Sequence, residues 1–337
     1  MIARYHNLKR YPSVFRSLTG LRIGEFDQLV KDVMPLYVQA EQTRHTLTRE
    51  GHSRQRAVGA GPHFFLSMRD HLLLAVVWLR QYPTNEVLGF LFGVSDSTVS
   101  RLVSRVVPLL AKMGKDQMRM PDLGRKHRRT LDDLLREIPE LGVVIDTFEQ
   151  SVQRPKSKSR TRDNRDNRDN TEADKWYSGK KKRHTVKSQL GVDRNSGEIV
   201  DVGESVPGPT NDLSLLKATR LLDRLPEGVS GEGDLAYVGI ATLHPQKLGF
   251  TPRKKPRGAD KYRPRGVDKE RPPEDIAYNT AFAKSRIVVE HTILRMRRYQ
   301  ALWQTDRHHR KGHTERVAAV AGLVNRQIRH RLPYLVN

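Results

Sequence analysis

The 337-residue chain contains no cysteine. Disulfide bonds, zinc sites built on thiolates and cysteine nucleophiles are therefore excluded. The sequence also lacks any apolar run approaching the roughly 20 residues that a helix needs to cross a bilayer. The N-terminal stretch MIARYHNLKRYPSVF has no apolar core of the kind found in secretion signals. We therefore expect a soluble bacterial protein of the cytoplasm that does not act at a membrane.

Acidic residues are the minority among the charged ones. Lys and Arg number 61 against 38 Asp and Glu, which gives a formal charge of +23 and an isoelectric point near 10.4. A folded protein this basic usually binds a polyanion, and double-stranded DNA is the default partner. Ribosomal and membrane-surface proteins share this composition, so charge alone does not define the chemistry. It favours a nucleoid-associated protein over an ordinary metabolic enzyme.

The spacing of apolar residues and of helix and strand breakers predicts a multidomain chain. An all-α helix-turn-helix region precedes an α/β core with a mixed sheet. The predicted segments are an N-terminal helical region (1–60), a helix-turn-helix domain (61–112), a helical basic linker (113–140), the α/β domain (141–305) and a C-terminal basic helix (306–337).

The stretch YPTNEVLGFLFGVSDSTVSRLV has the pattern of a helix-turn-helix. A short helix from Thr84 to Phe92 breaks at Gly93, and Ser95 is a suitable N-cap for a second helix that runs to about Leu110. An ordinary helical hairpin has the same pattern. The global charge favours DNA contact through side chains at the start of the second helix, namely Ser97, Thr98, Ser100, Arg101 and Arg105.

From residue 141 the pattern predicts a strand, a hairpin, a helix, a second strand and a long helix. The insertion at about 156–175 repeats the triplet RDN and has almost no apolar residues, so we interpret it as a flexible surface loop rather than a metal site.

Three carboxylates occupy notable positions in this α/β region. Asp146 is predicted to end an apolar strand and Asp234 to end another. Glu290 lies within RIVVEHTILRMRR, a helix predicted to be apolar on most sides and therefore buried. Each has a structural alternative: Asp146 could close a turn, Asp234 could cap a helix, and Glu290 could pair with Arg286. If the two strands are neighbours and the helix packs beside them, the carboxylates converge.

Converging carboxylates repel one another unless cations lie between them. Oxygen ligands without histidine or thiolate suit Mg²⁺ or Mn²⁺. Two such ions could stabilise both the attacking and the leaving oxygen of a phosphoryl transfer. A basic chain with a helix-turn-helix and an acidic metal site is typical of a protein that cuts and joins DNA.

The chain resembles the DDE transposases of bacterial insertion sequences, specifically insertion-sequence family five and its Harbinger-like relatives. The matching stretches are YPTNEVLGFLFGVSDSTVSRLV, VVIDTFEQSVQRP, WYSGKKKRHTVKSQL, VPGPTNDLSLL, GDLAY and RIVVEHTILRMRR, in the family's order. The resemblance implies an RNase H-like catalytic core in which Asp146, Asp234 and Glu290 are catalytic and hold two Mg²⁺ ions, for which Mn²⁺ can substitute.

The same resemblance extends to the arginines of the last stretch. Arg286 matches the arginine of the family's signature, Arg297 stands where many members have lysine, and Ala283 replaces a tyrosine found in some members. Both arginines are expected to contact DNA.

The resemblance implies a transposase that binds terminal inverted repeats, cleaves the element ends and joins the freed 3′-OH to target DNA. Because two ends must be handled together, we expect a homodimer or higher homo-oligomer on DNA. Two alternatives are a transposase-derived DNA-binding regulator without catalysis and a nuclease that only hydrolyses.

Several other polar residues are expected to have structural or surface roles. Asp212 is expected to cap a helix, and Trp176 and Tyr177 to anchor a loop. Lys180, Lys181, Lys182 and Arg183 form a basic loop that is either solvated or in contact with the DNA backbone. Four histidines show no spacing typical of a zinc site, and we interpret them as surface or phosphate-contacting groups: His184, His308, His309 and His313.

Overall fold

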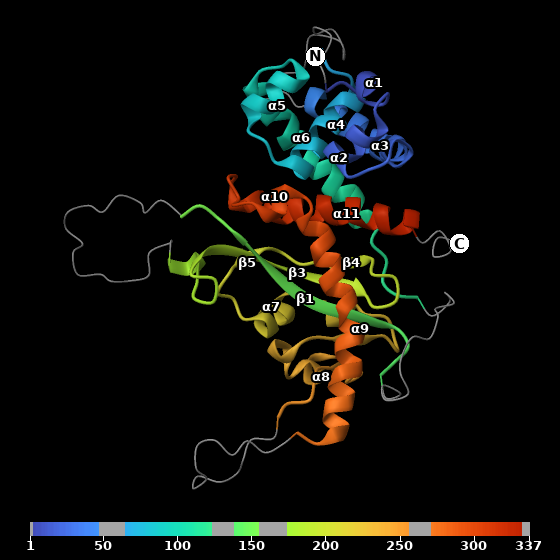
Figure 1. Cartoon of the computed structure of the whole chain (residues 1–337), viewed down its shortest axis with the longest axis vertical. Coiled ribbons are helices and arrows are strands. Elements are labelled where there is room, and N and C mark those ends of the chain that lie inside the picture. Colours follow the sequence, from blue (N-terminus) through green and yellow to red (C-terminus); the bar gives the residue numbers. More distant parts are fainter. Residues whose placement is uncertain (1–2, 47–64, 123–137, 155–173, 256–270, 332–337) are drawn as a thin grey trace, which may run out of the picture. The chain divides into compact units, whose positions relative to one another are not determined.

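The computed structural model describes residues 3–46, 65–122, 138–154, 174–255 and 271–331 (Figure 1). The chain forms two compact units, one from residues 1–117 and 295–337 and the other from residues 118–294. The RDN repeat and the basic cluster GRKHRRT of the predicted linker lie outside the described residues. Among the described helices, none has the length and apolar character needed to span a membrane.

The first unit is helical. Its helices are α1 (Tyr5–Leu8), α2 (Pro12–Thr19), α3 (Ile23–Thr46), α4 (Met68–Gln81), α5 (Asn85–Phe92), α6 (Asp96–Asp116), α10 (Gln300–Trp303) and α11 (His313–Arg331). The largest buried side chains of this unit include Trp78 and Tyr82, together with Phe15 and Phe26. The long helix α11 contributes an almost continuous buried run from Arg316 to Arg326.

The helix-turn-helix is present where the sequence predicted it. Helix α5 ends at Gly93, whose φ of 69° lies in the left-handed region that glycine adopts without strain. Ser95 caps α6, and its side chain accepts a hydrogen bond from the Thr98 backbone N–H at 3.2 Å. The N-cap and the turn predicted from these residue types are confirmed.

The second unit is built around a sheet. Its strands are β1 (Gly142–Ser151), β2 (Tyr177–Ser178), β3 (Arg183–Asp193), β4 (Ile199–Val202), β5 (Val206–Pro207), β6 (Ser230–Glu232) and β7 (Gly249–Phe250). The helices are α7 (Asp212–Thr219), α8 (Ile240–Leu243) and α9 (Pro273–Arg297), with short 3-10 turns η2 (Asp174–Trp176), η3 (Leu222–Arg224) and η4 (Leu235–Tyr237). The predicted order of strand, hairpin, helix, strand and long helix is confirmed.

The sheet is mixed. Along its main path the described strands follow the order β2-β3-β1-β6-β7, and β4 and β5 also pair with β3. Strand β1 is antiparallel to β3 and parallel to β6, and β6 is parallel to β7. The parallel register aligns Val144 with Glu232, so β1 and β6 run in the same direction toward Asp146 and Asp234.

The two faces of β1 differ in what covers them. Val143 and Ile145 belong to an apolar core with residues of α7, η4 and α8, including Leu216, Tyr237 and Ile240. Because side chains alternate along a strand, Asp146 lies on the other face, where Arg286 of α9 approaches it. Figure 1 shows α9 in front of the strands. A curled mixed sheet between helices is the fold class expected of an RNase H-like domain.

Candidate active site

Asp146 lies inside β1 rather than at its end. The strand continues to Ser151 because its antiparallel pairing with β3 persists, whereas the parallel pairing with β6 ends at Val144. The sequence prediction of a strand end was therefore wrong for β1 itself. The prediction identified instead the point just beyond the end of the parallel pairing between β1 and β6.

The Asp146 carboxylate has two close partners. Its Oδ1 accepts a hydrogen bond from the Thr147 backbone N–H at 2.7 Å, and its Oδ2 lies 4.0 Å from Nη2 of Arg286. Burial raises the pKa of Asp146 to about 6, opposed by the Thr147 hydrogen bond and by Arg286, and the charges of Asp234 and Asp212 raise it further. A cation placed among these carboxylates would favour their ionised forms.

Asp234 follows β6 and caps η4. Its Oδ1 accepts a hydrogen bond from the Ala236 backbone N–H at 2.8 Å, so the structural role considered for it is confirmed. The preceding Gly233 packs so closely on Tyr237 that a Cβ there would lie 2.6 Å from the tyrosine ring. The sharp turn fixes Asp234 at the end of β6, close enough to Asp146 to influence its pKa.

Asp212 does not cap α7, because Asn211 occupies the N-cap and accepts a hydrogen bond from the Ser214 N–H at 3.0 Å. The Asp212 Oδ1 instead accepts hydrogen bonds from Thr147 Oγ1 at 3.0 Å and from Lys187 Nζ at 2.9 Å. Asp212 is thereby connected to the residue that follows Asp146. No local sequence pattern indicates this contact, because Lys187 and Thr147 come from two different strands.

Glu290 is exposed on α9, and the prediction of a largely buried helix was wrong. Its neighbours Ile287 and Leu294 are 49% and 56% exposed, while Val289 and Ile293 face the interior. The helix is therefore two-sided, and apolar residues on the solvent face made it look buried from sequence. No three His, Asp or Glu side chains among the described residues are close enough together to hold a metal ion.

Two parts of the chain match known protein families. Residues 145–325 match the family described as DDE superfamily endonuclease, and residues 64–116 match the helix-turn-helix of DDE superfamily endonuclease. The chain belongs to the DDE superfamily endonucleases. It is also similar to a probable transposase for insertion sequence element IS702 of Microchaete diplosiphon, with 28% identity over 265 residues, which cover 78% of this chain and 82% of the relative. No solved structure matches the chain.

The second family match covers α4, α5 and α6 of the DDE endonuclease, and the exposed residues of α6 lie on the side opposite its buried Val99, Leu102 and Val106. Among the residues predicted to bind DNA, Ser97, Ser100 and Arg101 are exposed, and Thr98 is half-buried. Arg105 is also half-buried. Burial raises the pKa of Tyr37, and the charge of Arg105 opposes this shift. Tyr37 Oη and His71 Nδ1 are 2.7 Å apart.

The basic loop between β2 and β3 is exposed. It carries Lys180, Lys181, Lys182 and Arg183. Tyr177 lies edge-on against His184, with ring centroids 5.5 Å apart, which agrees with the predicted anchoring role of that tyrosine. The loop belongs to the same sheet as Asp146, because β3 pairs with β1.

The two arginines expected to contact DNA, Arg286 and Arg297, have different surroundings. The side chain of Arg286 is 13% exposed and points toward Asp146. Arg297 lies over the Trp303 ring, with its guanidinium carbon 5.5 Å from the centroid. His313 is fully buried, so its interpretation as a surface group was wrong.

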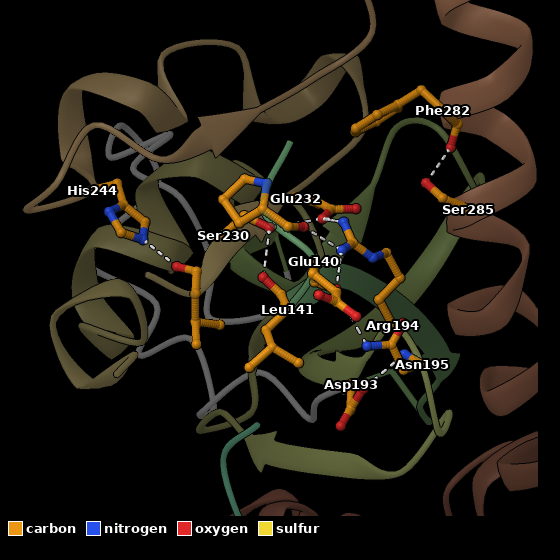
Figure 2. A network of polar contacts seen from close by, with 12 residues as sticks. Glu140, Leu141, Asp193, Arg194, Asn195, Ser230, Glu232, His244, Phe282 and Ser285 are labelled. Atoms are coloured by element: carbon orange, nitrogen blue, oxygen red, sulfur yellow. Dashed lines mark hydrogen bonds and ion pairs between the residues drawn. The ribbon is translucent and has the colours of Figure 1, made fainter. Parts of the chain in front are cut away.

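A buried polar network near the site was missed by sequence reasoning. Arg194 and Glu232 form an ion pair with almost no exposure, and Ser230 Oγ donates a hydrogen bond to Glu232 Oε1 at 2.8 Å (Figure 2). The only signal was the stretch GEGD, in which Glu232 precedes Asp234 by two residues. Its arginine partner follows β3, and no local pattern connects the two.

The donor chemistry of the site fits divalent cations. Asp146 and Asp234 supply hard oxygen atoms, and their mutual repulsion is relieved only partly by one arginine at 4.0 Å. Glu290 lies one helical turn from Arg286 on α9, which brings a third carboxylate to the same helix face as the arginine. The DDE endonuclease family implies divalent-metal use, and carboxylate oxygens are suitable ligands for such ions.

Proposed function

We propose that the chain is a DNA transposase that cleaves the ends of a mobile element and joins the freed 3′-OH to target DNA. The observation that carries this proposal is the approach of Asp146 and Asp234 from two neighbouring strands in a DDE endonuclease that also has a helix-turn-helix. The similarity to a probable transposase over 78% of the chain supports it.

Asp146, Asp234 and Glu290 would hold two Mg²⁺ ions, for which Mn²⁺ can substitute. When bound, the ions stabilise negative charge on the attacking and leaving oxygens of an in-line phosphoryl transfer. Both the hydrolysis and the joining step are such transfers, so one set of carboxylates serves both. Catalysis by positioning and charge stabilisation requires no covalent intermediate with the protein.

The remaining candidate residues bind and orient DNA in this proposal. Ser97, Ser100 and Arg101 at the exposed start of α6 would contact the terminal inverted repeats. The basic loop at Lys180–Arg183 would contact phosphates of the DNA strand entering the site. Because both element ends must be cut and joined together, the active form would be a homodimer or higher homo-oligomer on DNA.

The test uses supercoiled plasmid that carries the presumed ends of the element. The protein is incubated with it in Mg²⁺, Mn²⁺ or Ca²⁺, beside Asp146→Ala and Glu290→Ala. We expect end cleavage in Mg²⁺ and Mn²⁺ that is lost in both variants, together with strand-transfer products. Glu274→Ala, which removes an exposed carboxylate from the first turn of α9, is the matched control and should cleave normally.

The assay also separates the alternatives. Cleavage without strand-transfer products would indicate a nuclease that only hydrolyses. Tight binding to the ends with no cleavage in any metal would overturn the proposal in favour of a DNA-binding regulator.

A further inference from the structure

Glu232 is a fully buried carboxylate two residues before Asp234, one of the proposed metal ligands. It is 0% exposed and lies in β6 opposite Val144 of β1. Asp146 is two residues after Val144, and Asp234 is two residues after Glu232, so strand alternation places Glu232 and Asp146 on the same face of the sheet. A buried carboxylate at this position requires positive partners.

Arg194 is the first partner, and it satisfies only one of the two carboxylate oxygens. Its Nη1 donates to Glu232 Oε1, and its Nη2 donates to the Pro139 carbonyl and, at 2.5 Å, to the Glu140 carbonyl (Figure 2). Glu232 Oε2 is buried and accepts no hydrogen bond from the residues that the structure describes. The carboxylate is thus held firmly on one side and has a free oxygen on the other.

A glycine on the neighbouring strand accommodates this ion pair. A Cβ on Gly142 would lie 2.5 Å from Ser230 Oγ and would also collide with Glu232 Oε1, so the neighbouring strand leaves room for the carboxylate. The positive charge of the Arg194 guanidinium favours the ionised form of Glu232.

Arg286 approaches Asp146 on the face of the sheet that also carries Glu232. Its Nη2 is 4.0 Å from Asp146 Oδ2, which is longer than a hydrogen bond, and its buried Nε has no acceptor among the described residues. Glu232 lies on the same face of the sheet as Asp146, which is the face that the Arg286 guanidinium approaches. Arg286 therefore has unused donors, and Glu232 has an unused acceptor.

We propose that Glu232 is a positioning residue for the metal site. Glu232 is held by Arg194, and it accepts a hydrogen bond from Arg286 when a divalent cation binds Asp146. The guanidinium and the cation compete for the same carboxylate, and two positive charges at that distance repel each other. The free Oε2 of Glu232 gives Arg286 a second carboxylate to which it can donate a hydrogen bond. This inference rests on the proposed function, which makes Asp146 a metal ligand.

The effect of replacing Glu232 should therefore depend on the charge of Arg286. Without the charge of Glu232, Arg286 keeps Asp146 as its carboxylate partner and competes with the cation. Glu232→Gln should therefore weaken metal binding at Asp146. The loss should disappear when residue 286 carries no charge.

The experiment is a titration of the full-length chain with Mn²⁺, in which free Mn²⁺ is measured by electron paramagnetic resonance. Binding that is lost in Asp146→Asn defines the site. We expect Glu232→Gln to bind Mn²⁺ there about tenfold more weakly, as is usual for residues that support metal ligands. The double variant Glu232→Gln/Arg286→Met should bind as Arg286→Met does.

Asp201→Asn is the matched control. Asp201 is 8% exposed and pairs with Arg224 at 2.7 Å in the same unit, so its replacement also removes the charge of a buried carboxylate from an ion pair. It should leave the Mn²⁺ affinity unchanged. If Glu232→Gln does not fold, Arg194→Gln/Glu232→Gln removes both charges together and should show the same tenfold loss.

Three results would count against the inference. A wild-type affinity in Glu232→Gln would overturn it, and so would a tenfold loss that persists in the Arg286→Met background, which would indicate a purely structural role. If Mn²⁺ binding is the same in Asp146→Asn as in the wild type, the proposed function fails together with this inference.

Discussion

Lys187 is a nearly buried lysine whose partners explain its position. Its side chain is 9% exposed, and its Nζ donates to the Thr210 carbonyl at 2.5 Å and to Asp212 at 2.9 Å. A lysine rarely leaves water unless it is paired. Here it connects β3 to the start of α7 and stabilises the carboxylate that Thr147 also contacts.

We predict that Lys187→Met destabilises the second unit by about 2 kcal/mol, because Asp212 is left without its cation but is itself partly exposed. Urea denaturation measures the change. Lys187→Met/Asp212→Asn should recover part of the loss, and Lys217→Met, at an exposed position of α7, should have no effect. A Lys187→Met variant as stable as the wild type would contradict this account.

His313 is expected to make the stability of the first unit depend on pH. Burial, followed by the charge of Arg316, lowers its pKa to about 3, against roughly 6.5 for an unfolded histidine. A depressed histidine pKa means that the unfolded state binds the proton first. The stability contribution is therefore complete above pH 6.5 and is lost as the pH falls toward 3.

We predict that the free energy of unfolding decreases between pH 6 and pH 4 with a slope from this residue of up to about 1.4 kcal/mol per pH unit. His313→Gln should reduce the slope by up to that amount, whereas His309→Gln, at an exposed position, should retain it. Denaturation midpoints at several pH values provide the measurement. Equal slopes in His313→Gln and the wild type would show that another group carries the effect.

At the scale of elements, α6 and α11 approach each other through two glycines. A Cβ on Gly322 would lie 2.6 Å from the Gly114 Cα, and a Cβ on Gly114 would lie 2.9 Å from the Ala318 carbonyl oxygen. Neither backbone can move without separating the helices. Helix α6 also carries the residues predicted to contact DNA, so this crossing fixes the element that presents them.

We predict that Gly322→Ala destabilises the first unit by about 1–3 kcal/mol through overpacking, despite the better helix propensity of alanine. Thermal unfolding followed by circular dichroism measures the shift. Gly24→Ala in α3 is the control, because nothing lies within 4 Å of its added methyl group and it should be neutral or slightly stabilising. Equal effects of the two substitutions would contradict the close crossing.

Helix α6 also allows a direct test of DNA contact. Arg101→Ala should weaken binding to DNA of any sequence and reduce the dependence of binding on salt by about one counterion, as expected for a phosphate contact. Binding measured over a range of salt concentrations gives both quantities. Lys112→Ala removes an exposed charge farther along the same helix and should leave the slope unchanged. A similar loss in both variants would indicate only a general effect of charge.

The elements differ in how well the sequence predicted them. Helix α6 was predictable because Gly93, Ser95 and the apolar spacing are local signals that agree with one another. Helix α9 was found, but its burial was not, because Ile287 and Leu294 are apolar and yet exposed. Periodicity reports which residues can be buried and does not report which face the rest of the protein covers.

The candidate site shows the same limit. Asp146 and Asp234 were predictable as polar residues that follow apolar runs, because strand pairing then brings them near each other. The Arg194–Glu232 pair joins residues 38 positions apart, and the Lys187–Asp212 pair joins residues 25 apart. Such partners are determined by strand register, which a single sequence did not define.

At the scale of the whole molecule, positive charge predominates and yet carboxylates gather at one place. The formal charge is +23, while Asp146, Asp234 and Asp212 are close enough to influence one another electrostatically. A basic chain attracts DNA, and a local acidic site attracts cations, so the two features serve different partners. The central claim is that Glu290 joins Asp146 and Asp234 when cations bind.

The most direct test of that claim is a Mn²⁺ titration of Glu290→Gln beside Glu274→Gln, two exposed carboxylates of the same helix. The account predicts that Glu290→Gln weakens Mn²⁺ binding at the Asp146 site by about tenfold or more, while Glu274→Gln binds as the wild type does. Wild-type Mn²⁺ affinity in Glu290→Gln would contradict the account, because Glu290 would then not be a ligand.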